Sequence, residues 1–191
     1  MRLLSYQAVA HGADTVMFFQ MRQSAGACEK FHGAVIGHAG TPETRVFKEI
    51  AALGKELKTL GASTLGMRTR SKIAMLFDWD NWWGIEFSAG PTKELDYMAE
   101  FTRYYSALRN RNYNVDIVSP EDSLEPYALV IAPVYYMVKG DNDERIRRFV
   151  RRGGTFLTTF FSGMVQENDL VTLGGYPGKL RDILGIWVEE E

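Results

Sequence analysis

Short apolar runs alternate with helical patterns over most of the chain, and this alternation restricts the possible folds more than any other feature. Helical spacing of apolar residues over Leu95–Arg111 and Asn142–Arg152 separates runs of strand-like composition. The predicted strands are Lys72–Phe77, Tyr113–Val118, Leu129–Pro133 and Thr155–Phe160. Strands that alternate with helices pair in parallel through helical crossovers, so the sequence predicts an α/β fold with a doubly wound parallel sheet.

The N-terminal part adds a helix, a strand, a long loop and a second helix. Leu3–Ala10 fits a short helix, and the apolar run within Thr15–Gln20 predicts a strand covered on both faces. We expect the next helix to begin at Pro42, with Thr41 as its N-cap, and to end at Gly61. The intervening loop holds the one cysteine and two of the three histidines. Loops of this length are usually functional or disordered, and function is the better interpretation here.

Three further stretches have less regular patterns. Ala62–Ser71 is small and polar and predicts a linker between domains. The tryptophan-rich stretch after Phe77 predicts a long loop, and Ser162–Glu191 predicts glycine-rich loops with a short helix near Lys179–Leu184. The last residues read as the start of a strand, which predicts a truncated domain.

Composition excludes several classes of function. An apolar content of 46% can fill a sizeable core, and a net charge of -2 provides no field that gathers nucleic acid or anionic lipid. We therefore expect no nucleic-acid partner and no membrane partner, and no apolar run is long enough to span a bilayer. A single cysteine, Cys28, and a poor signal-peptide pattern suit the cytoplasm. We expect no cofactor and no metal site.

Several blocks in a single order carry a family resemblance. Phe18–Gln20, Arg22–Ser24 and Glu29–Ala34 resemble the end of the catalytic barrel in glycoside hydrolase family 42, the β-galactosidases. The family's second domain, an α/β trimerisation domain, is similar to Lys72–Trp83, Arg147–Thr159, Phe161–Gly163, Glu167–Asp169, Gly174–Gly178 and Leu180–Arg181. Co-linear blocks over nearly the whole chain are far more specific than one motif.

The resemblance implies a domain organisation. Residues 1–61 are expected to be the last helix–strand–helix portion of a (β/α)8 catalytic barrel, and 62–71 a linker. Residues 72–191 are expected to form the trimerisation domain, with a flavodoxin-like or glutamine-amidotransferase-like sheet. The chain is then a C-terminal fragment of a β-galactosidase, and the intact enzyme is a homotrimer.

The resemblance also implies a substrate role for Phe19, Glu29 and His32. In the family, a Glu-x-x-His pair after the eighth strand contacts sugar hydroxyls, and an aromatic residue at the end of that strand lines the galactose pocket. The ends of barrel strands are where such active sites lie, and a carboxylate and an imidazole can both bind hydroxyls. From their spacing alone, Glu29 and His32 read as an exposed carboxylate and an incidental histidine.

No catalytic residue is expected in this chain. A retaining glycosidase needs two carboxylic acids about 5 to 5.5 Å apart, and in the family both glutamates lie on earlier strands. The family's zinc-binding cysteine cluster also precedes this segment. We therefore expect the chain alone to be inactive, and to meet a galactoside substrate only together with the rest of the barrel.

Other interpretations remain open. The Asp78–Trp83 stretch suits a Mg²⁺ site or a sugar-stacking platform, although a buried contact between domains or subunits is favoured. The basic helix over 145–152 is better read as a solvated or ion-paired face than as a nucleic-acid surface. An amidotransferase needs a nucleophile after the third strand, where this chain has Val134, Tyr135 and Tyr136. The alternative functions are a stand-alone small-molecule-binding or regulatory domain, or activity recovered by complementation with a separate barrel.

Overall fold

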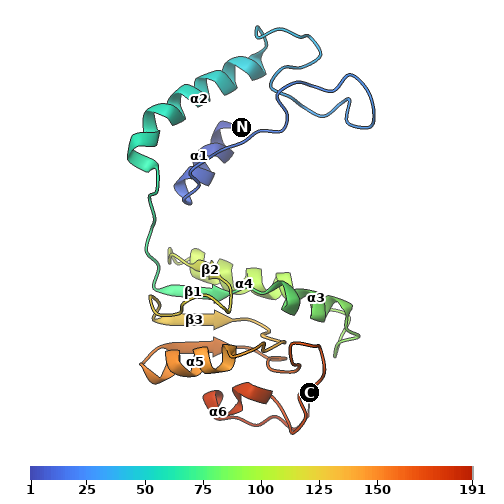
Figure 1. The fold of residues 1–191 in the computed structure, drawn as a ribbon, viewed down its shortest axis with the longest axis vertical. Coiled ribbons are helices and arrows are strands. Elements are labelled where there is room, and N and C mark those ends of the chain that lie inside the picture. The colour runs from blue at the N-terminus through green and yellow to red at the C-terminus, as the bar shows by residue number, and fades with distance from the viewer. Residues whose placement is uncertain (191) are drawn as a thin grey trace. The chain divides into compact units, whose positions relative to one another are not determined.

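The computed structural model describes residues 1–190 of the chain, which divides into two compact units, Met1–Thr69 and Arg70–Glu191. Figure 1 shows the helices and strands of both units. None of the helices within residues 1–190 combines the length and the apolar character needed to cross a membrane.

The second unit is built on a four-stranded parallel sheet. The strand order is β2-β1-β3-β4, so the chain starts in the middle, moves to one edge and returns to build the other. Parallel register pairs Met75 with Ile117 and with Ile131, on either side of β1. The strands are β1 (Ile73–Leu76), β2 (Asp116–Val118), β3 (Leu129–Ala132) and β4 (Thr155–Thr158). The predicted doubly wound α/β sheet is confirmed.

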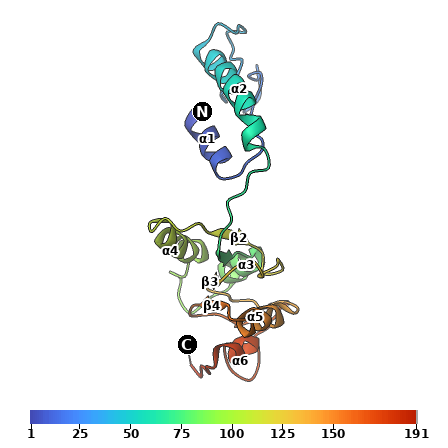
Figure 2. The same ribbon diagram turned by 90° about the vertical axis from the view of Figure 1, so that its left-hand side faces the viewer.

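Alternation along the strands creates two cores. Successive side chains of a strand point to opposite faces, so Ala74 and Leu76 join one cluster while Met75 joins the other. The first cluster packs against α5 (Asn142–Arg151) and the second against α4 (Tyr97–Arg109). Figure 2 shows these two helices on opposite sides of the sheet. Both faces are covered, as parallel sheets require.

Helix ends in this unit follow from polar side chains next to the apolar runs. The Asp96 carboxylate accepts a hydrogen bond from the Ala99 amide and caps α4. The predicted short C-terminal helix is also present, as a 3-10 turn, η1 (Gly178–Leu180), followed by α6 (Arg181–Leu184), which ends at Gly185 with φ of 67°. A Cβ at Gly154 would collide with the Phe149 ring, so α5 and β4 are joined by a turn that only glycine fits.

The tryptophan-rich stretch after β1 was expected to be a loop, and this prediction is wrong. It forms α3 (Trp79–Phe87), which lies at the carboxyl end of the strands in Figure 1. The Asp78 carboxylate accepts from the Asp80 amide and caps the helix. Its outer face carries aromatic rings while its inner face buries Asn81 and Ile85, so apolar residues surround the helix and no helical periodicity is visible in the sequence.

The first unit contains two helices, α1 (Arg2–Ala10) and α2 (Arg45–Thr64), which lie against each other. Glu56 of α2 accepts hydrogen bonds from Arg2 Nε at 2.9 Å and from Tyr6 Oη at 2.8 Å. The predicted helix over Leu3–Ala10 is confirmed.

The predicted limits of the second helix are wrong at both ends. Thr44, not Thr41, caps it by accepting from the Phe47 amide. Thr41 instead accepts from the Glu43 amide in the preceding turn. Both threonines are suitable N-cap residues, so the sequence alone does not distinguish between them. The helix also continues through Gly61 into the predicted linker, since one glycine lowers helical stability by only about 1 kcal/mol.

The strand predicted over Thr15–Gln20 is absent from the structure. A strand needs neighbouring strands to bond its amides and carbonyls. This run instead makes one main-chain hydrogen bond with a neighbouring segment, in which Gln20 O accepts from the Val35 amide. Met17 and Phe19 are exposed. The run therefore has the apolar composition of a buried strand, but no neighbouring strand pairs with it.

Candidate functional site

The loop between α1 and α2 is held closed at its base by main-chain bonds. The Ile36 amide donates to Met21 O at 2.8 Å, and the Gln23 amide donates to Ile36 O at 2.9 Å. Arg22 and Ile36 form an isolated parallel bridge. Residues 24–34 therefore form an excursion whose two ends are fixed side by side.

Two side chains reinforce this base. Gln23 Oε1 accepts from the His38 amide at 3.0 Å, and His38 Nε2 lies 2.8 Å from Ser24 O. A carbonyl oxygen only accepts, so Nε2 of His38 must carry the proton in this contact. Neither Gln23 nor His38 has a role that is predictable from local sequence, because their partners lie about fifteen residues away along the chain. Both act as ties between the limbs of the loop.

The structure brings Phe19 and His32 together but leaves both accessible. Their ring centroids lie 6.4 Å apart with the planes at 76°, an edge-to-face arrangement. The His32 amide donates to Glu29 O at 2.9 Å, so Glu29 and His32 share one turn of the excursion. All three predicted substrate residues are exposed. Their proposed contact with a sugar remains a prediction.

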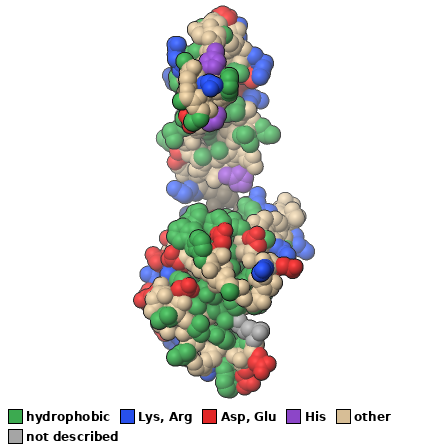
Figure 3. Space-filling view, turned by 90° about the vertical axis from the view of Figure 1, so that its right-hand side faces the viewer, with side chains coloured by type: hydrophobic (Ala, Val, Ile, Leu, Met, Phe, Trp, Pro, Cys, Tyr) green, Lys and Arg blue, Asp and Glu red, His purple; other side chains and the backbone are tan. Residues whose placement is uncertain are grey.

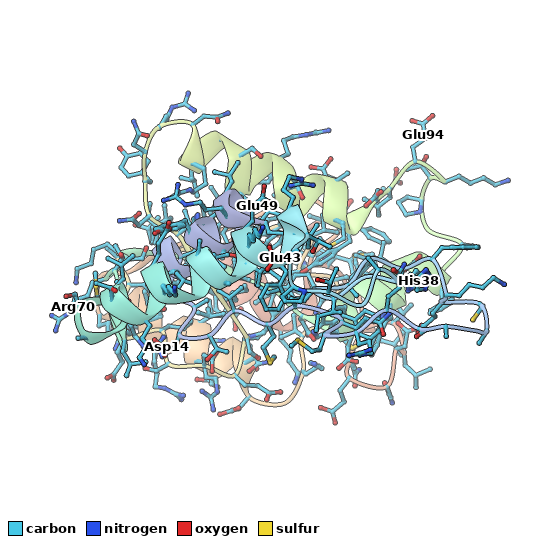
Figure 4. The ribbon with its side chains drawn as sticks, turned by 90° about the horizontal axis from the view of Figure 1, so that it is seen from above. Asp14, His38, Glu43, Glu49, Arg70 and Glu94 are labelled. Atoms are coloured by element: carbon cyan, nitrogen blue, oxygen red, sulfur yellow. The ribbon has the colours of Figure 1, made fainter. Side chains whose placement is uncertain are left out.

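Glu29 differs from the other carboxylates of its unit. Within residues 1–190 its carboxylate has no ion pair and no hydrogen bond. The other four carboxylates of Met1–Thr69 are all engaged: Glu56 with Arg2 and Tyr6, Asp14 with the Gly66 amide, Glu49 with Arg45 and Glu43 with Lys48. Figure 4 labels Asp14, Glu43 and Glu49. Both oxygens of Glu29 are therefore available to an external donor.

A second polar cluster lies at the carboxyl ends of β1 and β3. Lys139 Nζ contacts Asp78 Oδ1 at 2.9 Å and Asp80 Oδ2 at 2.6 Å. Asn81 Nδ2 donates to Asp78 Oδ2 at 2.7 Å, and Asn81 Oδ1 accepts from the Met137 amide at 2.8 Å. Because the ammonium lies between the two carboxylates, the Mg²⁺ interpretation of this pair finds no support. No group of three or more possible metal ligands occurs among residues 1–190.

The charges of this cluster are mutually stabilised. Burial alone would lower the pKa of Lys139, but hydrogen bonds to Asp80 and Asp78 outweigh burial and raise it. Burial raises the pKa of the neighbouring Tyr97 phenol to about 12. Lys139 is thus charged at neutral pH and serves as a structural counter-ion.

The turn after β3 occupies the place where an amidotransferase-like enzyme carries its nucleophile. Val134 adopts a φ of 47°, uncommon for a branched residue, and its amide donates to Thr159 Oγ1 at 2.7 Å. Val134 is fully buried. A valine offers no nucleophilic atom, so the geometry of such a turn is present without its chemistry.

The basic helix α5 is partly ion-paired, through two of its four arginines. Arg145 contacts Asp141, Arg147 contacts Glu144, and the Arg152 that follows the helix contacts Glu125. These pairs agree with the predicted solvated or ion-paired face.

Comparison with known proteins accounts for both units. Residues 71–191 match the family described as β-galactosidase trimerisation domain, and residues 1–60 match the family described as β-galactosidase, both of glycoside hydrolase family 42. The chain belongs to glycoside hydrolase family 42. The resemblance seen in the sequence is therefore confirmed.

Family 42 relatives match along the whole chain. β-Galactosidase BgaA of Planococcus sp. (strain 'SOS Orange') is 56% identical over 190 residues, which is 100% of this chain and 28% of the relative. The crystal structure of a β-galactosidase from Bacillus circulans sp. alkalophilus superposes with a TM-score of 0.93 at 60% identity, covering 99% of this chain and 28% of that one. The enzyme from Rahnella sp. R3 gives a TM-score of 0.89 at 47% identity, over 99% of this chain and 28% of its own.

The share of the family 42 relatives that this chain covers is also informative. This chain spans 28% of the length of the β-galactosidases that it matches. It thus corresponds to a segment of these relatives that includes their trimerisation domain.

Proposed function

We propose that this chain works as part of a retaining β-galactosidase that hydrolyses terminal β-D-galactosides. The observation that carries the proposal is the match of both units, in family order, to β-galactosidases over the whole chain. The chain spans 28% of those relatives, so the reaction belongs to the longer assembly. Alone, the chain should not turn over a galactoside, because the family resemblance implies that both catalytic glutamates lie on earlier strands of the barrel.

In this proposal the excursion 24–34 supplies part of the galactose pocket. The unengaged Glu29 carboxylate can accept hydrogen bonds from adjacent sugar hydroxyls, while the His32 imidazole binds another hydroxyl. The exposed Phe19 ring, held edge-to-face by His32, provides an apolar wall for a sugar face. The ties through Gln23 and His38 hold together the two limbs of the loop that carries Glu29 and His32.

The second unit is proposed to join three copies into a homotrimer. The family described as trimerisation domain covers residues 71–191. Ligands of doubly wound sheets bind at the carboxyl ends of the strands near the topological switch point. Here that position, between β1 and β3, is filled by Asp78, Asn81 and Lys139. This arrangement favours oligomerisation over a stand-alone small-molecule site.

A chimera tests the catalytic part of this proposal. The corresponding segment of the Bacillus circulans enzyme would be replaced with this chain, which is 60% identical to it, and assayed with a chromogenic β-galactoside. We expect turnover by the chimera and none by the chain alone. Glu29→Gln should lower kcat/KM by about 10- to 100-fold, the value of a hydrogen bond to a charged group.

The matched control is Glu43→Gln, which removes an exposed carboxylate paired with Lys48 in the same unit and should leave kcat/KM unchanged. A folded chimera without activity would overturn the β-galactosidase proposal. Full activity in Glu29→Gln would overturn only the role of Glu29.

A further inference from the structure

Three aromatic side chains form an exposed stripe along α3. Trp79, Trp83 and Phe87 follow one another at intervals of four residues, which places them on one face of the helix. Their exposed fractions are 55%, 49% and 86%. Figure 3 views the molecule from the side on which α3 lies in Figure 1, and hydrophobic side chains gather on that face of the unit Arg70–Glu191. We call these three residues the α3 aromatic face.

Trp79, at the N-terminal end of the α3 aromatic face, is packed against the aromatic groups beneath it. The Trp79 ring stacks on Trp82, with centroids 5.4 Å apart and planes at 25°, and lies 5.1 Å from the Phe77 ring. The helix itself is fixed because Asn81 bonds both the amide and the carbonyl of Met137. Side chains that are already ordered lose little conformational entropy when a partner covers them.

The area is large for a surface that faces only water. Fully accessible aromatic side chains bury about 150–250 Å² each, so the exposed fractions correspond to roughly 400 Å² of aromatic surface. A stable interface buries about 800 Å² per partner, with tryptophan enriched among the residues that dominate its energy. The face thus supplies the core, but not the rim, of an interface of ordinary size.

Charge does not oppose burial of this face. The ionisable residues of α3 are Asp80 and Glu86. Asp80 lies 2.6 Å from Lys139, whose ammonium it shares with Asp78. Glu86 makes no ion pair within residues 1–190, and its carboxylate can stay at a solvated rim when the aromatic rings are buried.

Symmetry indicates what kind of surface must meet this face. Three copies cannot form a ring through one self-complementary patch, so each copy must present two different surfaces, one to each neighbour. Exposed apolar side chains elsewhere in residues 70–190 include Leu170, Val171 and Leu173, on the loop that follows Asp169. Leu173 is 90% exposed.

We propose that the α3 aromatic face binds a second copy of this chain, and that it does so head-to-tail against the Leu170–Leu173 loop of the next copy. The inference rests on the trimer proposed above and identifies its contact surfaces. The same face does not bind sugar in this proposal.

Light scattering on the 191-residue chain at tens of micromolar tests the proposal. The unchanged chain should reach three times the 21.6 kDa of one copy. The double variant Trp83→Gln, Phe87→Gln should weaken association at least about 30-fold, as expected when residues of this type are lost from the centre of an interface. Tyr113→Ser, which removes an aromatic side chain of similar exposure away from α3, should change nothing.

Mixing two variants tests the proposal more directly, because a head-to-tail contact uses two different surfaces. Leu173→Gln alone should likewise weaken the association of the chain. An equimolar mixture of Leu173→Gln with the α3 double variant should form a species of two copies, since each supplies the surface that the other lacks and one intact contact remains. Circular dichroism tests whether each variant is folded. If the double variant does not fold, the single variant Phe87→Gln replaces it in both experiments.

The outcomes separate the two proposals. A strictly monomeric unchanged chain would overturn both the trimer and the role of α3. A trimer that the folded α3 variants leave intact would overturn the role of α3 alone. Quenching of tryptophan fluorescence by galacto-oligosaccharide, lost in the Trp83 variant without any change in mass, would assign the face to sugar instead.

Discussion

Met1–Thr69 buries one apolar side chain, Leu53, whereas the described part of Arg70–Glu191 buries two apolar clusters on the two faces of a sheet. The larger unit therefore buries enough apolar surface to stabilise its fold by itself. The smaller unit is held by local bonds at its ends and leaves Met17, Phe19 and Phe31 exposed. A unit can thus have defined helices and defined turns while much of its apolar surface stays exposed.

The largest expected effect comes from the core of the larger unit. Phe149 is 1% exposed and packs between α5 and the sheet, so Phe149→Ala should cost about 3–5 kcal/mol. Hydrogen exchange should then accelerate throughout β1, β3 and β4 and stay unchanged in α1 and α2. Leu53→Ala is the matched control and should affect α1 and α2 only. Parallel acceleration in both units after either substitution would contradict their independence.

Alkaline pH should destabilise the larger unit. Burial raises the pKa of Tyr97 from 10.0 to about 12, so the folded state holds this proton more tightly than the unfolded state. The resulting stabilisation is complete below pH 10 and is lost as the pH rises towards 12. It corresponds to about 2–3 kcal/mol at 1.36 kcal/mol per pKa unit.

Urea unfolding of the unchanged chain and of Tyr97→Phe, followed across that pH range, measures this effect. The unchanged chain should lose more free energy of unfolding than the variant, which has no phenol to titrate. Identical pH profiles would show that Tyr97 does not carry the dependence.

A smaller effect is expected at the Lys139 cluster. Lys139→Met leaves the buried Asp78 carboxylate without its ammonium partner and should cost about 1–2 kcal/mol. Arg147→Met, which removes a surface pair with Glu144, should stay within about 0.5 kcal/mol. Thermal unfolding monitored by circular dichroism compares the two. Equal losses would mean that the cluster is no more than another surface ion pair.

The sheet and its two large helices could be predicted because the apolar pattern and the burial agree there. Val130 and Ile131 are apolar, sit in a short run, and are buried on opposite faces. The pattern failed where an apolar residue is not buried within the chain. Phe19 and Trp83 are as apolar as core residues, yet one lies in a loop without strand neighbours and the other on the outer face of a helix.

The residues of the candidate site also divide into some that could be predicted and some that could not. The residues Glu29 and His32 could be located because the family resemblance assigned them a role, but their spacing alone would not have distinguished them from an ordinary loop. Gln23 and His38 were missed because their bonds join segments distant in sequence. One local signal for α3 was present, since Asp78 is a strong N-cap residue directly after a strand.

The passage between the two units has a practical consequence for anyone who handles this protein. After α2 ends at Thr64, residues 65–70 form neither helix nor strand, and Arg68 and Arg70 are exposed there. Proteases cut most readily at such exposed, irregular backbone. Trypsin should therefore cut near this point and release the larger unit, so that purified material stored with traces of protease accumulates the larger unit as a stable fragment.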